Sequence, residues 1–369
     1  MTKAAELAKM GEVLTNGQIG GRRNIAYNGS AIVAQRGTQT GQGGAEAMSA
    51  VDRFKLFGGS TAGRLTSSQD SDSPIGFGNS LKLDCTTADT SVAAGEFLLL
   101  EQRIEGQDLQ QLKYNQSSAE TSTISFYVKG NASAQYTFAL QYHLSGGTAR
   151  WFTKGFAVTT DWTRVVITIP GDSQASSGSD YGIADDNNTG ANLMIWLHGG
   201  TNFSSGTHQD TAWADRSYTT LFQDNQTSFY DSTNRTFFLT GLQFELGSQA
   251  TPFEHRSVGE ELALCQRYYQ QSDADTGSGL TGNSFHGHTI NTTECIGQAP
   301  FVTTMRATPT IVIFGNDGTA GEAHLIGTSD VSGVAASLIT ATGFIKISKS
   351  GGLTDGREYG CHYTATAEL

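Results

Sequence analysis

Apolar and polar residues alternate along the first two thirds of the chain. In residues 123–129, Ile124, Phe126 and Val128 alternate with polar or amphipathic neighbours, and residues 135–144 show the same period of two. This period is typical of strands with one buried face. Similar segments recur at 80–85, 96–104, 122–130, 134–144, 149–158, 162–171, 192–199 and 235–246. Polar, Gly-rich loops and no helical pattern separate them, so we predict an all-β fold with an antiparallel sandwich of jelly-roll type.

Two segments outside this pattern predict helices. Residues 2–14 place Leu7, Met10 and Val13 on a mostly apolar surface behind a possible Thr2 cap,. Thirteen residues make a marginal helix on their own, so we expect this one to dock on a partner chain or a symmetry mate. Residues 257–272 form the second candidate, where Ser257 and Glu260 have capping-box spacing,.

These patterns predict four regions along the chain. Residues 1–23 are an N-terminal anchoring helix and a Gly-rich joint, and residues 24–256 are the jelly-roll sandwich. Residues 257–272 are a linking helix. Residues 273–369 are a smaller C-terminal β domain of short strands and Gly-rich turns.

Charge and composition exclude several classes of function. The net charge of −12 and the pI near 5.1 oppose nucleic-acid binding, which needs a basic surface,. No apolar run is long enough for a signal peptide or a membrane span, so we expect neither membrane insertion nor Sec export,. The four cysteines are widely spaced, which predicts reduced and mostly buried thiols in a protein made in a reducing cytoplasm,.

The sequence contains none of the common catalytic motifs. The chain has no G-x-S-x-G elbow, HExxH, P-loop or dinucleotide signature, so we predict no catalytic residues and no cofactor,. Asp185 and Asp186 are the best carboxylate pair for glycoside hydrolysis, but adjacent acids in a Gly/Asn-rich loop are usually only solvated,. The same loop has oxygen ligands that suit a structural cation, although it lacks EF-hand spacing.

Two groups of side chains are candidates for binding. His286 and His288 would share one face of a strand, and three chains around an axis would then offer six imidazoles to a transition metal,. The alternative, which we favour, is two exposed loop histidines. Trp151, Trp213 and Tyr218 could form a sugar-stacking platform, or could pack against a neighbouring subunit,. Trp162 and Trp196 lie in regular strand patterns and are predicted to be core residues.

Several stretches resemble structural proteins of tailed-bacteriophage particles. TGLQFELGSQATPFEHRSVGEELALCQRYYQ (240–270) resembles a segment that follows a carbohydrate-binding-module-like sandwich in that group. The entry segment 21–54, the strand 161–169, the start 4–14 and the end 305–369 are also similar to it. The resemblance implies a virion protein, a homotrimer, and a tail-fibre or surface-appendage role in host attachment or particle assembly. Synthesis in the host cytoplasm and release by lysis fit the cysteines and the lack of a signal for Sec export. Other virion proteins and a host-surface glycan are the implied partners.

Three other functions stay open at this stage. A head-decoration or capsid-fibre protein would use the same fold, with the N-terminal helix on the capsid lattice. A glycan-cleaving tail spike would need an acidic pair, and the chain shows neither a convincing one nor a parallel β-helix repeat,. A soluble carbohydrate-binding module of a bacterial enzyme would need a secretion signal or a catalytic neighbour.

Overall fold

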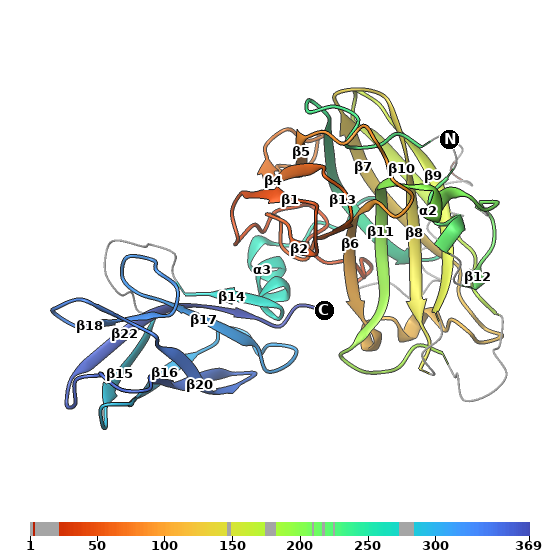
Figure 1. The fold of residues 1–369 in the computed structure, drawn as a ribbon. Coiled ribbons are helices and arrows are strands. Elements are labelled where there is room, and N and C mark those ends of the chain that lie inside the picture. Colours follow the sequence, from red (N-terminus) through yellow and green to blue (C-terminus); the bar gives the residue numbers. More distant parts are fainter. Residues whose placement is uncertain are drawn as a thin grey trace. The chain divides into compact units, whose positions relative to one another are not determined.

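A computed structural model describes residue 3 and residues 22–145, 149–173, 182–208, 210–215, 218–223, 226–272 and 284–369 (Figure 1). The chain divides into two compact units, residues 1–258 and residues 259–369. Of the predicted helix 2–14 only residue 3 is described, and it is helical; Leu7, Met10 and Val13 lie outside the described residues. No helix in the described part of the chain is long and apolar enough to cross a membrane.

The first unit is a sandwich of two antiparallel sheets over its described residues, as the alternating pattern predicted. The six-stranded sheet has the order β1 (Gln39–Gln42), β4 (Arg64–Asp70), β5 (Ser80–Thr87), β13 (Thr236–Leu246), β7 (Ser122–Gly130), β10 (Thr163–Ile169). The seven-stranded sheet has the order β12 (Ala214–Asp215), β9 (Ala149–Val158), β8 (Ala134–His143), β11 (Thr189–Gly199), β6 (Phe97–Glu105), β3 (Lys55–Gly59), β2 (Ala47–Met48).

The core lies between these two sheets. Ile124, Phe126 and Val128 point inward from β7 and are fully buried, and Phe138 and Leu140 of β8 join the same cluster. Each inward side chain therefore comes from one parity of its strand, because successive side chains in a strand point to opposite faces.

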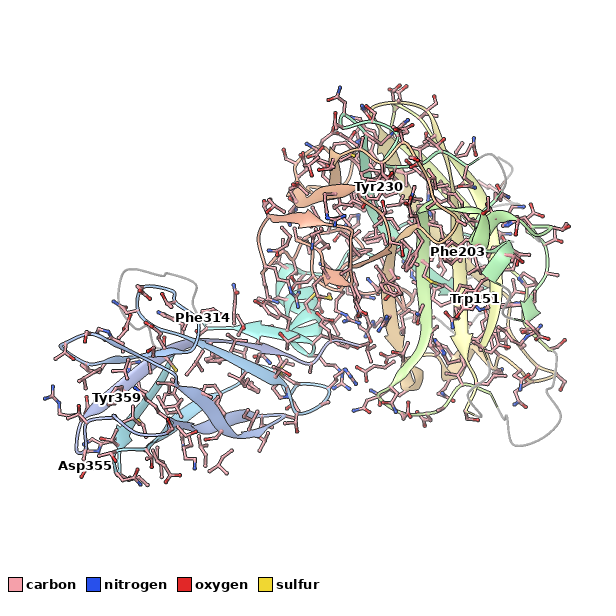
Figure 2. The ribbon with its side chains drawn as sticks, in the orientation of Figure 1. Trp151, Phe203, Tyr230, Phe314, Asp355 and Tyr359 are labelled. Carbon is pink, nitrogen blue, oxygen red and sulfur yellow. The ribbon has the colours of Figure 1, made fainter. Side chains whose placement is uncertain are left out.

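The seven-stranded sheet is covered on its outer face as well. Leu99, Met194, Trp196 and Phe222 form a second apolar cluster there. The cluster includes Trp151 and lies beside α2 (Thr201–Ser204), whose Phe203 packs against it, and beside the 3-10 turn η3 (Tyr218–Thr220) (Figure 2). This second cover explains why nine consecutive residues of β11 are buried, with no alternation,.

The second unit is a smaller β domain. Its sheet has the order β19 (Asp330–Ser332), β18 (Glu322–Leu325), β22 (Glu358–Thr366), β15 (Phe285–Thr289), β16 (Glu294–Pro300), β21 (Gly343–Ser348), β20 (Ala335–Thr340). Two further strands pair with β22: β14 (Tyr269–Gln271) and β17 (Thr310–Phe314). Its core includes Phe285, Phe344 and Tyr363.

The segment 257–272 differs from the single linking helix that its pattern predicted. Helix α3 covers Val258–Gln266 only, and β14 follows it. Tyr269 is opposite Thr366 in the ladder with β22. Pairing with a strand about a hundred residues further along the chain, which no local pattern reveals, therefore ends the helix early and draws this segment into the second unit.

Candidate functional site

The structure does not assemble the predicted aromatic platform. Trp151 is only 6% exposed and lies in the apolar cluster on the outer face of the seven-stranded sheet. Trp213 is packed with its ring 5.0 Å from that of Tyr142 and 5.1 Å from that of Tyr114, and its indole N–H donates to the Pro170 carbonyl at 2.6 Å. Only Tyr218 is exposed, at 51%. Trp151 is therefore buried and Trp213 is partly buried against the core, so both tryptophans stabilise the sandwich and neither forms an exposed platform with Tyr218.

The other two tryptophans also differ in role. Trp196 is buried, as predicted, but in the outer-face cluster and not between the sheets. Trp162 is half-buried on the outside of the six-stranded sheet, where it donates to Asp72 at 2.9 Å. That bond and the Lys129 ammonium hold the pKa of Asp72 below its usual range, with Lys129 the larger cause.

Trp151 begins a row of polar side chains across the outer face of the seven-stranded sheet. Gln141 is opposite Trp151, Asn192 is opposite Gln141, and Arg103 is opposite Asn192. Directly opposed residues point to the same face, and neighbouring strands lie about 4.8 Å apart. Four hydrogen-bonding side chains thus follow one line across four strands.

Three of these four side chains are buried, and Arg103 is partly buried. Gln141 is 6% exposed, and the Trp151 indole N–H and the Asn192 side-chain oxygen have no hydrogen-bond partner among the described residues. Nearby, burial raises the pKa of Glu101, although the Arg103 guanidinium at 2.7 Å opposes the shift. Buried polar atoms without partners are costly, but a ligand arriving from solvent cannot reach these atoms directly.

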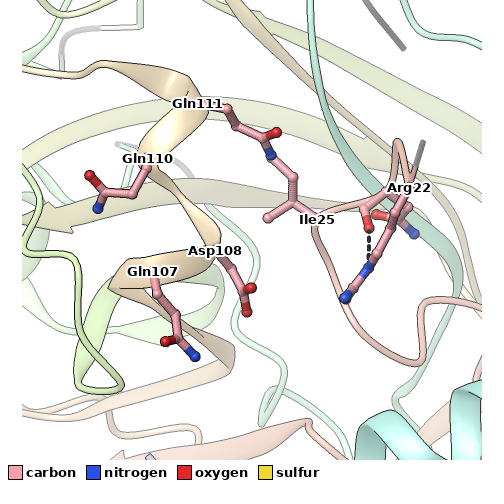
Figure 3. A pocket seen from close by; sticks show the side chains of 7 residues that line it. Arg22, Ile25, Gln107, Asp108, Gln110 and Gln111 are labelled. Carbon is pink, nitrogen blue, oxygen red and sulfur yellow. Dashed lines mark hydrogen bonds between the residues drawn. The ribbon is translucent and has the colours of Figure 1, made fainter. Parts of the chain in front are cut away.

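An open polar pocket lies elsewhere on the sandwich, where the chain enters its first strand layer (Figure 3). One wall comes from Arg22, Asn24 and Ile25. The other comes from the 3-10 turns η1 (Gly106–Asp108) and η2 (Gln110–Leu112), which follow β6 and contribute Gln107, Asp108, Gln110 and Gln111. The pocket has a volume of about 380 Å³.

Hydrogen bonds fix both walls of this pocket. The buried Asn24 side chain donates to the Leu242 carbonyl at 3.0 Å and accepts from the Ala26 and Phe244 amides. Gln110 donates to the Gly106 carbonyl at 2.9 Å, which holds the two turns together. The Tyr27 hydroxyl donates to one carboxylate oxygen of Asp108.

Several polar groups remain available within the pocket. The Arg22 guanidinium stacks on the Tyr27 ring, 4.6 Å from its centroid, and donates through Nε to the Asn24 carbonyl; no residue that the structure describes bonds to its terminal nitrogens. In Figure 3, Arg22 and Asp108 extend from opposite walls toward the same space. The exposed Gln111 amide has no hydrogen-bond partner among the described residues. A cation, a carboxylate and an amide together suit a neutral ligand with many hydroxyl groups.

The predicted acid pair borders this pocket through its backbone, since the Asp186 carbonyl accepts from the Gln107 amide at 2.9 Å, and the predicted metal candidates belong to the second unit. His286 and His288 are both exposed on strand β15, with His288 Nδ1 3.0 Å from the Thr289 carbonyl oxygen. Asp186 accepts from the Asn188 backbone amide at 3.0 Å and from its side chain, so it stabilises its own turn. A separate acidic group, Asp317, Glu322 and Asp330, places carboxylate oxygens within 4.8 Å of one another in the second unit. All four cysteines are buried, and none forms a disulfide within the described part of the chain, as predicted.

Sequence reasoning did not identify this pocket. Its residues lie in irregular chain and in two short 3-10 turns, where neither strand nor helix periodicity applies,. The GQDLQQL stretch (106–112) is dense in amides, and that density is the only sequence feature that marks it.

Comparisons with known proteins give no family. No protein-family model matches the chain, and no curated protein matches it. The chain is similar to an enzymatically active tailspike domain of bacteriophage CBA120, with a TM-score of 0.30 and 10% identity over 61% of this chain and 21% of that one. It thus spans about a fifth of that tailspike chain.

Two carbohydrate-binding modules are also similar to the chain. A family 11 module of a Clostridium thermocellum cellulosomal cellulase has a TM-score of 0.29 and 11% identity over 56% of this chain and 98% of the module. A xylan-binding domain from Paenibacillus barcinonensis has a TM-score of 0.26 and 13% identity, covering 56% and 92%. Scores this low carry no argument, so the all-β fold stands on the sheets described above.

Proposed function

We propose that the chain is a non-catalytic structural protein of a bacteriophage particle, a tail fibre or surface appendage, which binds a host-surface glycan in the Arg22–Asp108 pocket. The particle assignment is supported by the sequence resemblance of residues 240–270 and of the chain's two ends. The glycan assignment is carried by one observation: open hydrogen-bonding groups of three kinds surround an accessible polar pocket on a rigid sandwich.

The pocket chemistry fits sugar hydroxyls. A hydroxyl can donate to the Asp108 carboxylate and accept from Arg22, and a second hydroxyl can do both with the Gln111 amide. Tyr27 orients both charged groups in advance, since it holds Asp108 through its hydroxyl and Arg22 over its ring. Side chains that are already placed lose less entropy when a ligand binds.

A glycan array of bacterial surface polysaccharides, followed by calorimetry with the best oligosaccharide, tests the glycan assignment. Gln111→Ala removes a neutral hydrogen bond worth about 0.5–1.5 kcal/mol, so affinity should fall about 2- to 10-fold. Asp108→Ala removes a charge-assisted bond worth about 1.5–3 kcal/mol, so the loss should be about 10- to 100-fold.

Gln135→Ala is the matched control, because this exposed glutamine of β8 lies on the same sandwich and does not line the pocket. Unchanged binding by both pocket variants would remove the pocket from the proposal. The same fold would also serve a head-decoration protein. Antibody labelling of purified particles separates the two locations, since label on the head would replace the tail-fibre role.

A further inference from the structure

The second unit has an apolar groove at one end of its sheet. The groove has a volume of about 510 Å³ and is lined by residues 298–300 of β16, 338–340 of β20 and 342–345 around the start of β21. Leu338 is 58% exposed and Ile345 is 47% exposed. Contiguous exposed apolar side chains around a groove are characteristic of a contact surface.

Strand β20, which forms one side of the groove, lies at the end of its sheet. Among the described residues it pairs with β21 only. Natural proteins usually protect such edges with charged residues or proline, because the free backbone groups can pair with another chain. Residues 331–345 contain no charged residue and no proline. Leu338 also has a φ of 54°, a strained conformation for a leucine,.

The charge distribution indicates what covers this surface. The chain carries a net charge of −12, so two copies repel each other over most of their surfaces,. The two segments that line the groove, 295–305 and 331–345, contain no Asp, Glu, Lys, Arg or His. Two copies can therefore meet here without like-charge repulsion. A strongly charged partner, in contrast, would find no opposite charge on this face.

We propose that this groove and the edge of β20 form the surface through which a second copy of the chain docks. Leu338 and Ile345 of one copy bury their exposed area against the other copy, and the main driving force is apolar burial. The contact goes beyond the proposed glycan binding and does not depend on it, because its residues all belong to the second unit.

Sedimentation equilibrium of the full chain over a range of concentrations tests the proposal. The wild type should give a multiple of the 39.2 kDa chain mass. Leu338→Glu and, separately, Ile345→Lys should each weaken association at least tenfold, because each places a charge in the apolar contact. Two variants of opposite charge are used so that the result does not rest on one substitution, and circular dichroism checks that each is folded.

Ile290→Glu is the matched control, because this isoleucine is 55% exposed on the same unit but does not line the groove. Its mass should equal that of the wild type. A wild-type mass of 39.2 kDa at the highest concentration would overturn the proposal, as would folded groove variants that associate like the wild type. Monovalent glycan binding, measured on the same variants, should be unchanged, so failure of this contact and failure of the glycan assignment give different results.

Discussion

The buried ion pair between Arg150 and Asp172 allows a quantitative prediction for the sandwich. Arg150 and Asp172 are each 4% exposed, and Arg150 donates to Asp172 through Nε and, at 3.2 Å, through a terminal nitrogen. The Tyr142 hydroxyl donates to the same carboxylate at 2.7 Å. Asp172→Ala would leave a buried guanidinium and a buried hydroxyl without this partner.

The expected loss is about 3–5 kcal/mol of unfolding free energy, the usual cost of removing one member of a buried pair. Arg150 also contacts Asp215 at 2.6 Å, but Asp215 is 83% exposed, and solvent screens a pair of that kind to about 1 kcal/mol or less,. Asp215→Ala is therefore the matched control on the same arginine.

Urea unfolding followed by tryptophan fluorescence measures this loss in the sandwich alone, because all four tryptophans lie in residues 1–258. With a slope of about 2–3 kcal/mol per molar, Asp172→Ala should lower the midpoint by about 1–2.5 M. A shift below about 0.3 M, or an equal shift for Asp215→Ala, would refute the reasoning that burial makes the Asp172 contact the dominant one.

Three further predictions concern other parts of the chain. Burial lowers the pKa of His198 from 6.5 in spite of nearby Glu96, so the unfolded state binds the proton more readily and stability should fall as pH drops below about 6.5,. When urea midpoints are measured at several pH values, the midpoint of His198→Gln should change less with pH than that of the wild type. An equal change in both proteins would contradict the prediction. In Gly297→Ala the added Cβ would clash with a backbone carbonyl of β15, so the second unit should lose about 1–3 kcal/mol of unfolding free energy, measured by hydrogen exchange,. Gly259→Ala is the control, because its Cβ would enter open space and the unfolding free energy should not change. The four buried thiols should resist a thiol reagent until urea unfolds the chain, because the reagent cannot reach them, and burial raises the pKa of Cys85 to about 11,. Fast reaction of any thiol in the folded protein would contradict this burial.

The strands of the sandwich were predictable from the period of two in apolar and polar residues. Alternation in β7 and β8 identified both strands, because successive side chains point to opposite faces of a sheet; the outer parity of β8 was predicted to be exposed and is instead buried by the second cover,. The tryptophan roles were not predictable in the same way. Trp151 lies in a strand pattern, which does not tell whether its outer face is exposed. That face is buried by α2 and by residues 221–222, which are far along the chain.

The candidate site was less accessible to sequence reasoning. Asp108 and Gln111 lie in 3-10 turns, and Arg22 reaches them only because Asn24 is anchored to β13 more than two hundred residues away. Contacts of that separation leave no local period, so no window along the chain brings the three residues together.

A crystal structure of the full chain with the best-binding oligosaccharide tests the central claim most directly. The account predicts a sugar ring between Arg22 and Asp108, with a hydroxyl on each and the Gln111 amide in contact. Sugar density on the outer face of the seven-stranded sheet, over Gln141 and Asn192, with an empty Arg22–Asp108 pocket, would contradict it.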